Sequence, residues 1–218
     1  MCDARRVSGY VCLQGGREFT PECEAMDRAV IDAAAARHVG VIAGAARIGS
    51  DYAGASSRAR QHYERLGTKV HIVPDPRVDP AAALDALDGE LDLVVLPGGS
   101  PSSLLDVLSG PVGERMLALH AAGLAISGAS AGAMVLCSHM ARPDRNDVTS
   151  GLGLVEGLAL PHWTPGSDPR WPVPDITLWG LPECSGVLID PDGARTAVGV
   201  QPTSVRLDGT WVEVARVG

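Results

Sequence analysis

Short apolar runs alternate with longer helix-like stretches through the first two thirds of the chain. The apolar runs predict strands at residues 7–13, 39–43, 70–73, 91–96 and 124–127. The stretches between them predict helices at residues 21–37, 51–66, 80–87 and 112–122. Each strand is apolar throughout instead of alternating with polar positions, which is typical of a parallel sheet covered on both faces.

Beyond residue 180 the spacing of apolar runs and turns changes. Four short strands are predicted at residues 186–189, 194–200, 203–207 and 211–217. Asp-Pro-Asp-Gly, Gln-Pro and Asp-Gly-Thr separate them, and these turns predict antiparallel hairpins added at the end of the sheet. No repeat, low-complexity tract or linker interrupts the chain, so one α/β domain over residues 1–218 is expected.

The composition limits the partners. Hydrophobic residues make up 45% of the chain and charged residues 20%, which is ordinary for a globular protein. The net charge of −8 disfavours phosphate backbones, so nucleic acid is not expected as a partner. No apolar stretch is long enough to span a membrane, and the N-terminal run is too short for a signal peptide. We therefore expect a cytoplasmic protein with no membrane partner.

The segment with the clearest chemistry is Gly-Ala-Ser-Ala-Gly at residues 128–132, between a predicted strand and the helix that follows at once. Small residues on both sides of a serine at such a junction form a nucleophile elbow, in which the hydroxyl of Ser130 projects from a tight turn. The N–H groups at the start of the helix favour negative charge, as on the oxygen of an attacked carbonyl. The alternative is a small-residue turn that only packs a helix on the sheet.

A second glycine turn, Leu-Pro-Gly-Gly-Ser-Pro, ends the preceding strand. In a parallel sheet the loops after the strand C-termini share one edge, so this turn can face Ser130. The N–H groups of Gly99 and Ala131 would then form the oxyanion hole. An ordinary turn or a phosphate-binding nest is the alternative, although no Walker lysine and no G-x-G-x-x-G pattern is present.

A serine nucleophile needs a base, and elimination selects His162. The single lysine, Lys69, opens a strand far from the elbow. His139 is predicted about 13 Å along the helix from Ser130, which is too far. His120 lies at the far end of the nucleophile strand. Three further histidines flank early elements and are interpreted as surface or strand-end residues: His38, His62 and His71. His162 follows the apolar run at residues 155–160, at the exit of a predicted strand.

An acid must hold the base in the correct tautomer. Asp147 is the best-placed candidate, on the loop between the elbow helix and the next strand. Asp144 competes with it, and Glu183 in Leu-Pro-Glu-Cys is a more distant candidate.

Five segments together resemble the dipeptidase E and cyanophycinase family of serine peptidases, whose fold is akin to class I glutamine amidotransferases. They are LPGGSPSSLLDVL, ISGASAGAMVL, the Asn-Asp of RNDV, GLGLVEGLALPHW and LPECSGVLI, in the family's order. The resemblance implies that Ser130 is the nucleophile, His162 the base and Asp147 the orienting acid. Gly99 and Ala131 match the oxyanion positions. Serine replaces the cysteine of the amidotransferase elbow, which disfavours glutaminase chemistry.

The segment at residues 161–179 holds three tryptophans and five prolines directly after the base. Trp163 and its neighbours are interpreted as an aromatic wall over the substrate, or alternatively as a loop packed on the sheet edge. Where the family often has two arginines, only Arg170 is present. Its guanidinium suits a carboxylate of the substrate, although pairing with Asp168 or Asp175 is the alternative.

We therefore predict a flavodoxin-like α/β serine peptidase with a mostly parallel sheet, helices on both faces and C-terminal antiparallel hairpins. It would hydrolyse small peptides near a terminus without a metal or organic cofactor. The alternatives are a serine esterase or amidase acting on another substrate, and a binding module without catalysis. A homodimer is left open beside a monomer.

Overall fold

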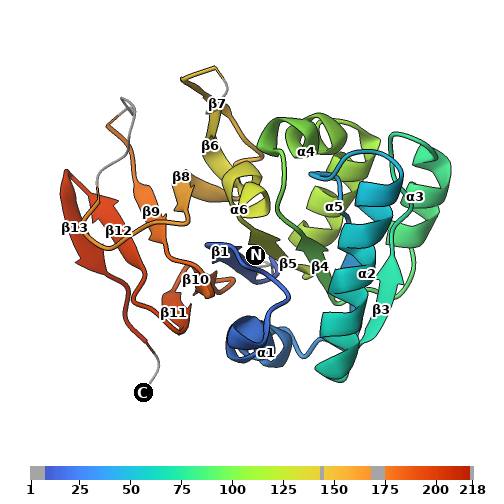
Figure 1. Cartoon of the computed structure of the whole chain (residues 1–218), viewed down its shortest axis with the longest axis horizontal. Coiled ribbons are helices and arrows are strands. Elements are labelled where there is room, and N and C mark those ends of the chain that lie inside the picture. Colours follow the sequence, from blue (N-terminus) through green and yellow to red (C-terminus); the bar gives the residue numbers. More distant parts are fainter. Residues whose placement is uncertain (1–7, 143–144, 168–174, 217–218) are drawn as a thin grey trace, which may run out of the picture.

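The computed structural model describes residues 8–142, 145–167 and 175–216. Its helices are η1 (Pro21–Cys23), α1 (Glu24–Ala33), α2 (Ser50–Arg65), α3 (Pro80–Leu87), α4 (Pro101–Leu108), α5 (Pro111–Ala121) and α6 (Ala131–Leu136). Its strands form two sheets, one at the centre of the molecule and one on its left side in Figure 1.

The central sheet has seven strands in the order β11-β10-β1-β5-β4-β2-β3. They are β1 (Val11–Gln14), β2 (His38–Val41), β3 (Lys69–Ile72), β4 (Leu93–Leu96), β5 (Ala125–Ala129), β10 (Ser185–Ile189) and β11 (Arg195–Gly199). β1 to β5 pair in parallel, whereas the β10–β11 hairpin joins β1 in the antiparallel direction. The predicted mostly parallel sheet is confirmed, with β5, which leads to Ser130, near its middle.

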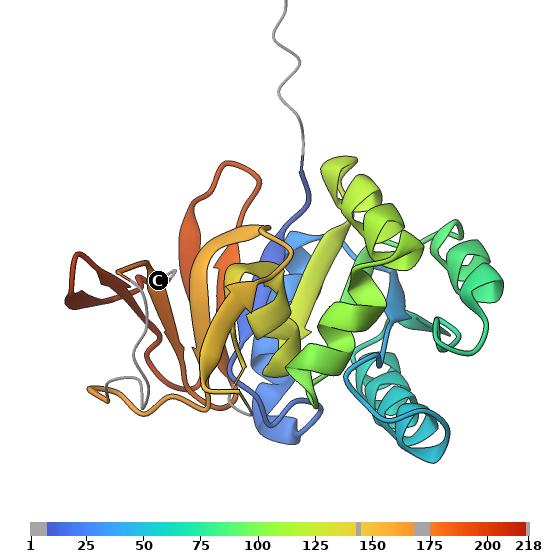
Figure 2. The same ribbon diagram turned by 90° about the horizontal axis from the view of Figure 1, so that it is seen from above.

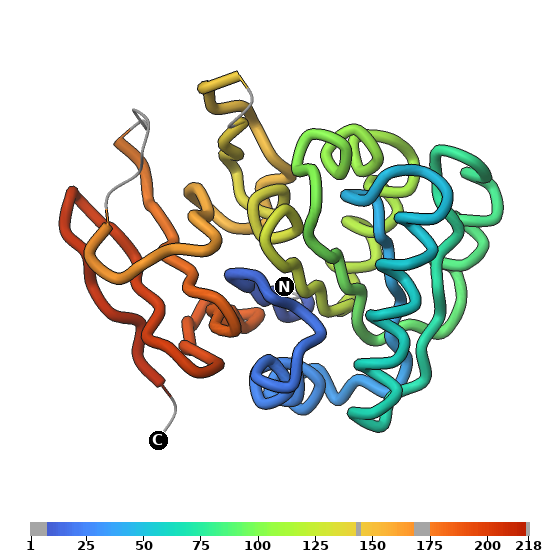
Figure 3. Tube along the Cα trace, viewed as in Figure 1, coloured from blue at the N-terminus to red at the C-terminus, as the bar shows by residue number. Residues whose placement is uncertain are grey.

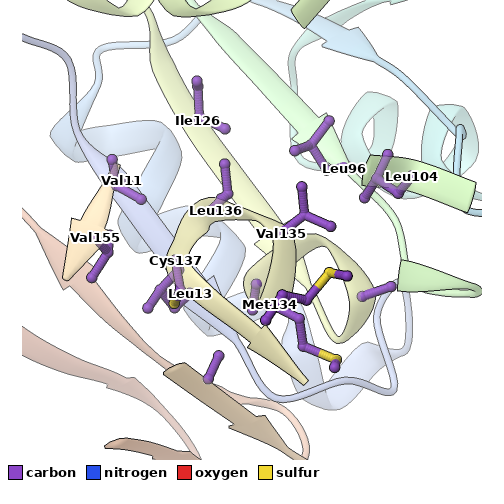
Figure 4. Close-up of a cluster of buried hydrophobic side chains, with 14 of the residues drawn as sticks. Val11, Leu13, Leu96, Leu104, Ile126, Met134, Val135, Leu136, Cys137 and Val155 are labelled. Carbon is purple, nitrogen blue, oxygen red and sulfur yellow. The ribbon is translucent and has the colours of Figure 1, made fainter. Parts of the chain in front are cut away.

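Helices cover both faces of this sheet because successive strand residues point to opposite faces. Cys12, Leu93 and Ala125 pack with α1 and α2 on one face. Leu96 and Ile126 belong to the other face, which α3 to α6 cover. Figure 2 shows the helices on the two sides of the sheet, and Figure 4 shows side chains of α6 beside those of β4, β5 and α4. The strands are apolar throughout because both faces of the sheet are buried, as predicted.

The second sheet was not predicted. It has six strands in the order β13-β12-β9-β8-β6-β7. They are β6 (Cys137–Arg142), β7 (Asp147–Ser150), β8 (Val155–Pro161), β9 (Leu178–Leu181), β12 (Ser204–Leu207) and β13 (Thr210–Glu213). β6, β8 and β9 pair in parallel, and the outer strands pair antiparallel. Only one of the two C-terminal hairpins therefore extends the central sheet, because β12–β13 pairs with β9 instead.

The elbow helix is shorter than the sequence indicated. α6 ends at Leu136, and Cys137 has the extended backbone angles φ −74° and ψ 164°. The chain then continues as β6, so His139 lies on a strand and not on a helix. None of the helices in the described part of the chain combines the length and apolar character that a membrane crossing needs.

Candidate active site

Ser130 is the single residue between β5 and α6, and its backbone conformation is one that non-glycine residues rarely adopt. Its angles are φ 49° and ψ −106°. The flanking glycines make this turn possible. A Cβ on Gly128 would lie 2.5 Å from the carbonyl carbon of Gly132, and one on Gly132 would lie 2.3 Å from the carbonyl oxygen of Leu96. The turn therefore has the tight strand-to-helix geometry that the residue pattern predicted.

His162 lies next to the elbow although it comes from the second sheet. Its Nε2 is 3.0 Å from Ser130 Oγ, a distance at which the hydroxyl can donate a hydrogen bond to the imidazole. His162 follows the last residue of β8 and has a left-handed backbone with φ 53°. Its side chain is half-exposed, so solvent and a small substrate can reach it.

The segment after β1, residues 15–20, holds His162 in place. The N–H of His162 donates to the carbonyl oxygen of Gly15 at 2.9 Å. A Cβ on Gly16 would lie only 2.4 Å from Cε1 of the imidazole, so the ring packs directly on this glycine. The N–H of Cys184 donates to the carbonyl oxygen of Gly16 at 3.0 Å, which ties the same segment to the β9–β10 connection. Figure 3 traces the backbone of this segment, in blue.

Glu183, and not Asp147, faces the second nitrogen of the base. Glu183 Oε1 is 3.3 Å from Nδ1 of His162, and Arg17 Nε is 3.7 Å from the other carboxylate oxygen. The parallel pairing of β8 with β9 sets Pro161 opposite Leu181. The residues that follow these two strands, His162 and Glu183, therefore emerge at the same sheet edge.

The prediction of Asp147 as the orienting acid is corrected by this geometry. Asp147 begins β7, at the end of the hairpin with β6, where both of its oxygens accept hydrogen bonds from Arg142 at 2.7 and 2.6 Å. The hydrogen bond from Arg142 lowers the pKa of the Asp147 carboxyl below its usual value. The pairing of Asp147 with Arg142 therefore belongs to the exposed β6–β7 hairpin. Asp144, the competing candidate, lies outside the described residues.

Two backbone N–H groups near Ser130 form no hydrogen bond within the described residues, namely those of the predicted oxyanion hole. Within the described part of the chain, no hydrogen bond is formed by the N–H of Gly99 or of Ala131. Ala131 is the first residue of α6, and the turn that contains Gly99 follows β4, the neighbour of β5. The N–H of Gly98, by contrast, donates to Glu18 Oε1 at 2.9 Å.

An apolar pocket of about 300 Å³ adjoins these groups. Ser130, His162 and Gly99 line one side of it. The remaining wall is apolar and comes from the start of α4, from α6 and from the end of β8: Pro101, Met134, Ala159, Leu160 and Pro161. Among these lining residues none carries a guanidinium or ammonium group.

The sequence matches the model of peptidase family S51 over residues 14–206, which is most of the chain. The chain belongs to peptidase family S51. It is a serine peptidase of the dipeptidase E type, which confirms the resemblance that the motifs indicated.

Solved structures share the fold of this S51 peptidase. A peptidase from an acI-B1 Actinobacterium is 21% identical, with a TM-score of 0.79 over 98% of this chain and 97% of that chain. A candidate Peptidase E protein from Listeria monocytogenes EGD-e is 16% identical, with a TM-score of 0.63 over 89% of this chain and 100% of that chain. No curated protein is similar enough to count as a match.

The tryptophan segment does not line the pocket where the structure describes it. Trp163 is buried, donates its indole N–H to the carbonyl oxygen of Ser167 at 2.8 Å, and packs on Trp211 with ring centroids 4.8 Å apart. The alternative interpretation, a loop packed on the sheet, therefore describes Trp163 better than a wall over the substrate. Arg170 lies outside the described residues, so its role stays a prediction.

A buried polar network behind the elbow was missed in the sequence. Asp27 is 1% exposed and accepts hydrogen bonds from Gln14 at 2.7 Å and from Tyr63 at 3.1 Å. Nε2 of His62, which was interpreted as a surface or strand-end residue, lies 2.8 Å from the same carboxylate. Gln14 also donates to Ser127 at 2.9 Å, and so joins β1 to the nucleophile strand. The only signal in the sequence was one polar residue in each of two otherwise apolar strands, Gln14 in β1 and Ser127 in β5.

Proposed function

We propose that this S51 peptidase hydrolyses short peptides near a terminus with Ser130 as nucleophile, His162 as base and Glu183 as the orienting acid. The contact of 3.0 Å between Ser130 Oγ and His162 Nε2, at a turn where Ser130 has the rarely adopted φ of 49°, is the observation that carries the proposal. Glu183 on the other ring nitrogen supports a proton on Nδ1, which leaves Nε2 free to accept the serine proton.

The reaction follows from these positions. Ser130 Oγ attacks the scissile carbonyl carbon while His162 takes the hydroxyl proton, and the N–H groups of Gly99 and Ala131 stabilise the oxyanion. The carbon–nitrogen bond then breaks as His162 gives its proton to the leaving amine. Water, deprotonated by the same imidazole, releases the acyl group from Ser130 and restores the enzyme.

The pocket supports a short substrate with an apolar side chain beside the scissile bond. Its volume of 300 Å³ is at the lower end of ligand sites, which favours one side chain over an extended polypeptide. Met134, Leu160 and Pro161 offer dispersion contacts and no charge partner. An acidic side chain would therefore need a cation from elsewhere, and Arg170 remains the candidate for that role.

A fluorophosphonate probe tests the proposal. We expect the probe to label Ser130 in the wild type and not in Ser130→Ala, as peptide mapping by mass spectrometry would report. Absence of labelling would favour a binding module without catalysis. A panel of matched peptides and esters, with apolar and acidic side chains, then separates a peptidase from an esterase.

The remaining parts of the proposal concern the surroundings. The described cysteines are buried free thiols, which supports a reducing compartment such as the cytoplasm: Cys12, Cys23, Cys137 and Cys184. The net charge of −8 supports a small peptide, and not a nucleic acid, as the partner.

A further inference from the structure

One carboxylate at the active site has no part in the triad. Glu18 reaches from the segment after β1 to the turn after β4, where its Oε1 accepts the N–H of Gly98 at 2.9 Å. A Cβ built on Gly98 would lie 2.9 Å from this oxygen and 3.2 Å from Cβ of Ser130. The Glu18 carboxylate and the Ser130 side chain therefore both lie next to Gly98.

The charge of Glu18 is not neutralised within the described part of the chain. Its side chain forms no ion pair there, whereas the neighbouring Arg17 is directed to Glu183. Glu18 is half-buried, so its carboxylate is partly removed from solvent. A partly desolvated anion beside a substrate site is stabilised by a cation of the substrate.

The backbone around Glu18 is built to hold this side chain. Arg17 and Phe19, on either side of it, have φ values of 57° and 68°, in the left-handed region. Such conformations are costly for residues with side chains and persist where surrounding contacts enforce them. Here the contacts are those of Gly15 and Gly16 with His162 and Cys184. The same segment thus positions the base and the unpaired carboxylate.

A peptide with a free N-terminus carries a positively charged α-ammonium group close to its first carbonyl carbon. The α-amino nitrogen is separated from the first carbonyl carbon by two bonds of about 1.5 Å each. When Ser130 attacks that carbonyl carbon, from a distance of about 3–3.5 Å, the ammonium group must lie close to the serine. Glu18 is the described carboxylate that reaches the turn beside Ser130 from outside the triad.

We propose that Glu18 binds the α-ammonium group of the substrate and so directs cleavage to the first peptide bond of unblocked peptides. The inference rests on the proposed function, because it needs Ser130 as the nucleophile. It makes Glu18 a specificity-determining residue, and it selects the N-terminus as the end at which this peptidase acts.

Glu18→Gln tests the proposal, because glutamine keeps an oxygen that can accept the N–H of Gly98 and loses only the charge. The substrates are alanyl and leucyl aminocoumarin amides, each with a free and an acetylated amino group. For the free amines we expect kcat/KM to fall by about ten- to a hundredfold in the variant, the value of a charge-assisted contact. For the acetylated forms little change is expected. Glu22→Gln, an exposed neighbour, is the matched control and should behave as the wild type.

The pH profile supplies a second readout. Wild-type activity on the free amines should fall as the substrate ammonium loses its proton at about pH 8, and Glu18→Gln should lack this dependence. Equal wild-type rates on free and acetylated substrates, or an equal loss for both in the variant, would overturn the inference while fluorophosphonate labelling of Ser130 persisted. If the wild type is not labelled at Ser130, the proposed function fails, and this inference fails with it.

Discussion

The two sheets contribute to the active site in different ways. The central sheet presents Ser130 mainly through local backbone geometry, since consecutive residues at the end of β5 and the start of α6 form the turn. The second sheet presents His162 at the end of β8, but contacts from residues distant in the sequence hold the imidazole in place. The placement of Ser130, the proposed nucleophile, therefore depends mainly on consecutive residues, whereas that of His162, the proposed base, depends on how three segments pack together.

Substitution of Ser130, the proposed nucleophile, should give the largest effect and leave both sheets intact. Ser130→Ala removes the attacking oxygen, so we expect kcat to fall by roughly 10³-fold or more. Loss of one oxygen at a partly open site should change the free energy of unfolding by less than about 1 kcal/mol. Steady-state kinetics and urea denaturation check the two parts. Near-normal turnover would show that the reaction does not use the elbow.

The acid provides the next test, because its position depends on the pairing of β8 with β9. Glu183→Gln keeps the shape of the side chain but disfavours the productive tautomer of His162, so kcat should fall by about 10²- to 10⁴-fold. Asp147→Asn is the matched control and should change kcat less than twofold. The reverse ranking of the two variants would return the role of the acid to Asp147.

This difference between the two regions also explains what could be predicted from the sequence. The parallel strands and the tight turn between β5 and α6 are local patterns, and the structure confirms both of them. Glu183 was only a distant candidate because sequence separation does not report strand pairing. The repeated pattern Leu-Pro-His and Leu-Pro-Glu was the available signal, since it marks two strand ends that the parallel register of Pro161 with Leu181 brings side by side.

The second sheet escaped prediction for a related reason. The small and apolar residues after Ser130 predicted a helix that carries His139, yet α6 ends at Leu136. β6 forms because Cys137 and Met140 are buried in the core and its backbone pairs with β7 and β8. Pairing with strands later in the chain thus outweighs the local helical pattern.

Gly16 tests whether the segment after β1 holds the base. Gly16→Ala adds a methyl group 2.4 Å from Cε1 of His162, so the ring must move, and we expect kcat/KM to fall by about 10²-fold. Gly67→Ala is the control, because Gly67 also has a positive φ but no atom within 4 Å of the added carbon. Both variants should lose stability through backbone strain, by about 1–3 kcal/mol. Equal kcat/KM values for the two variants would show that the contact with His162 is unimportant.

The smallest effect is expected at Asp147, whose pairing with Arg142 belongs to the exposed β6–β7 hairpin. Because Arg142 lowers the pKa of Asp147 in the folded state, folding favours the ionised carboxylate. This contribution is present above the ordinary value of 3.8 and is lost as the pH falls through the lowered pKa. Asp147→Asn should therefore be slightly less stable than the wild type at pH 7. In urea denaturation the difference should shrink as the pH falls below 3.8, and a difference that grew under acid would contradict the assignment of the pair.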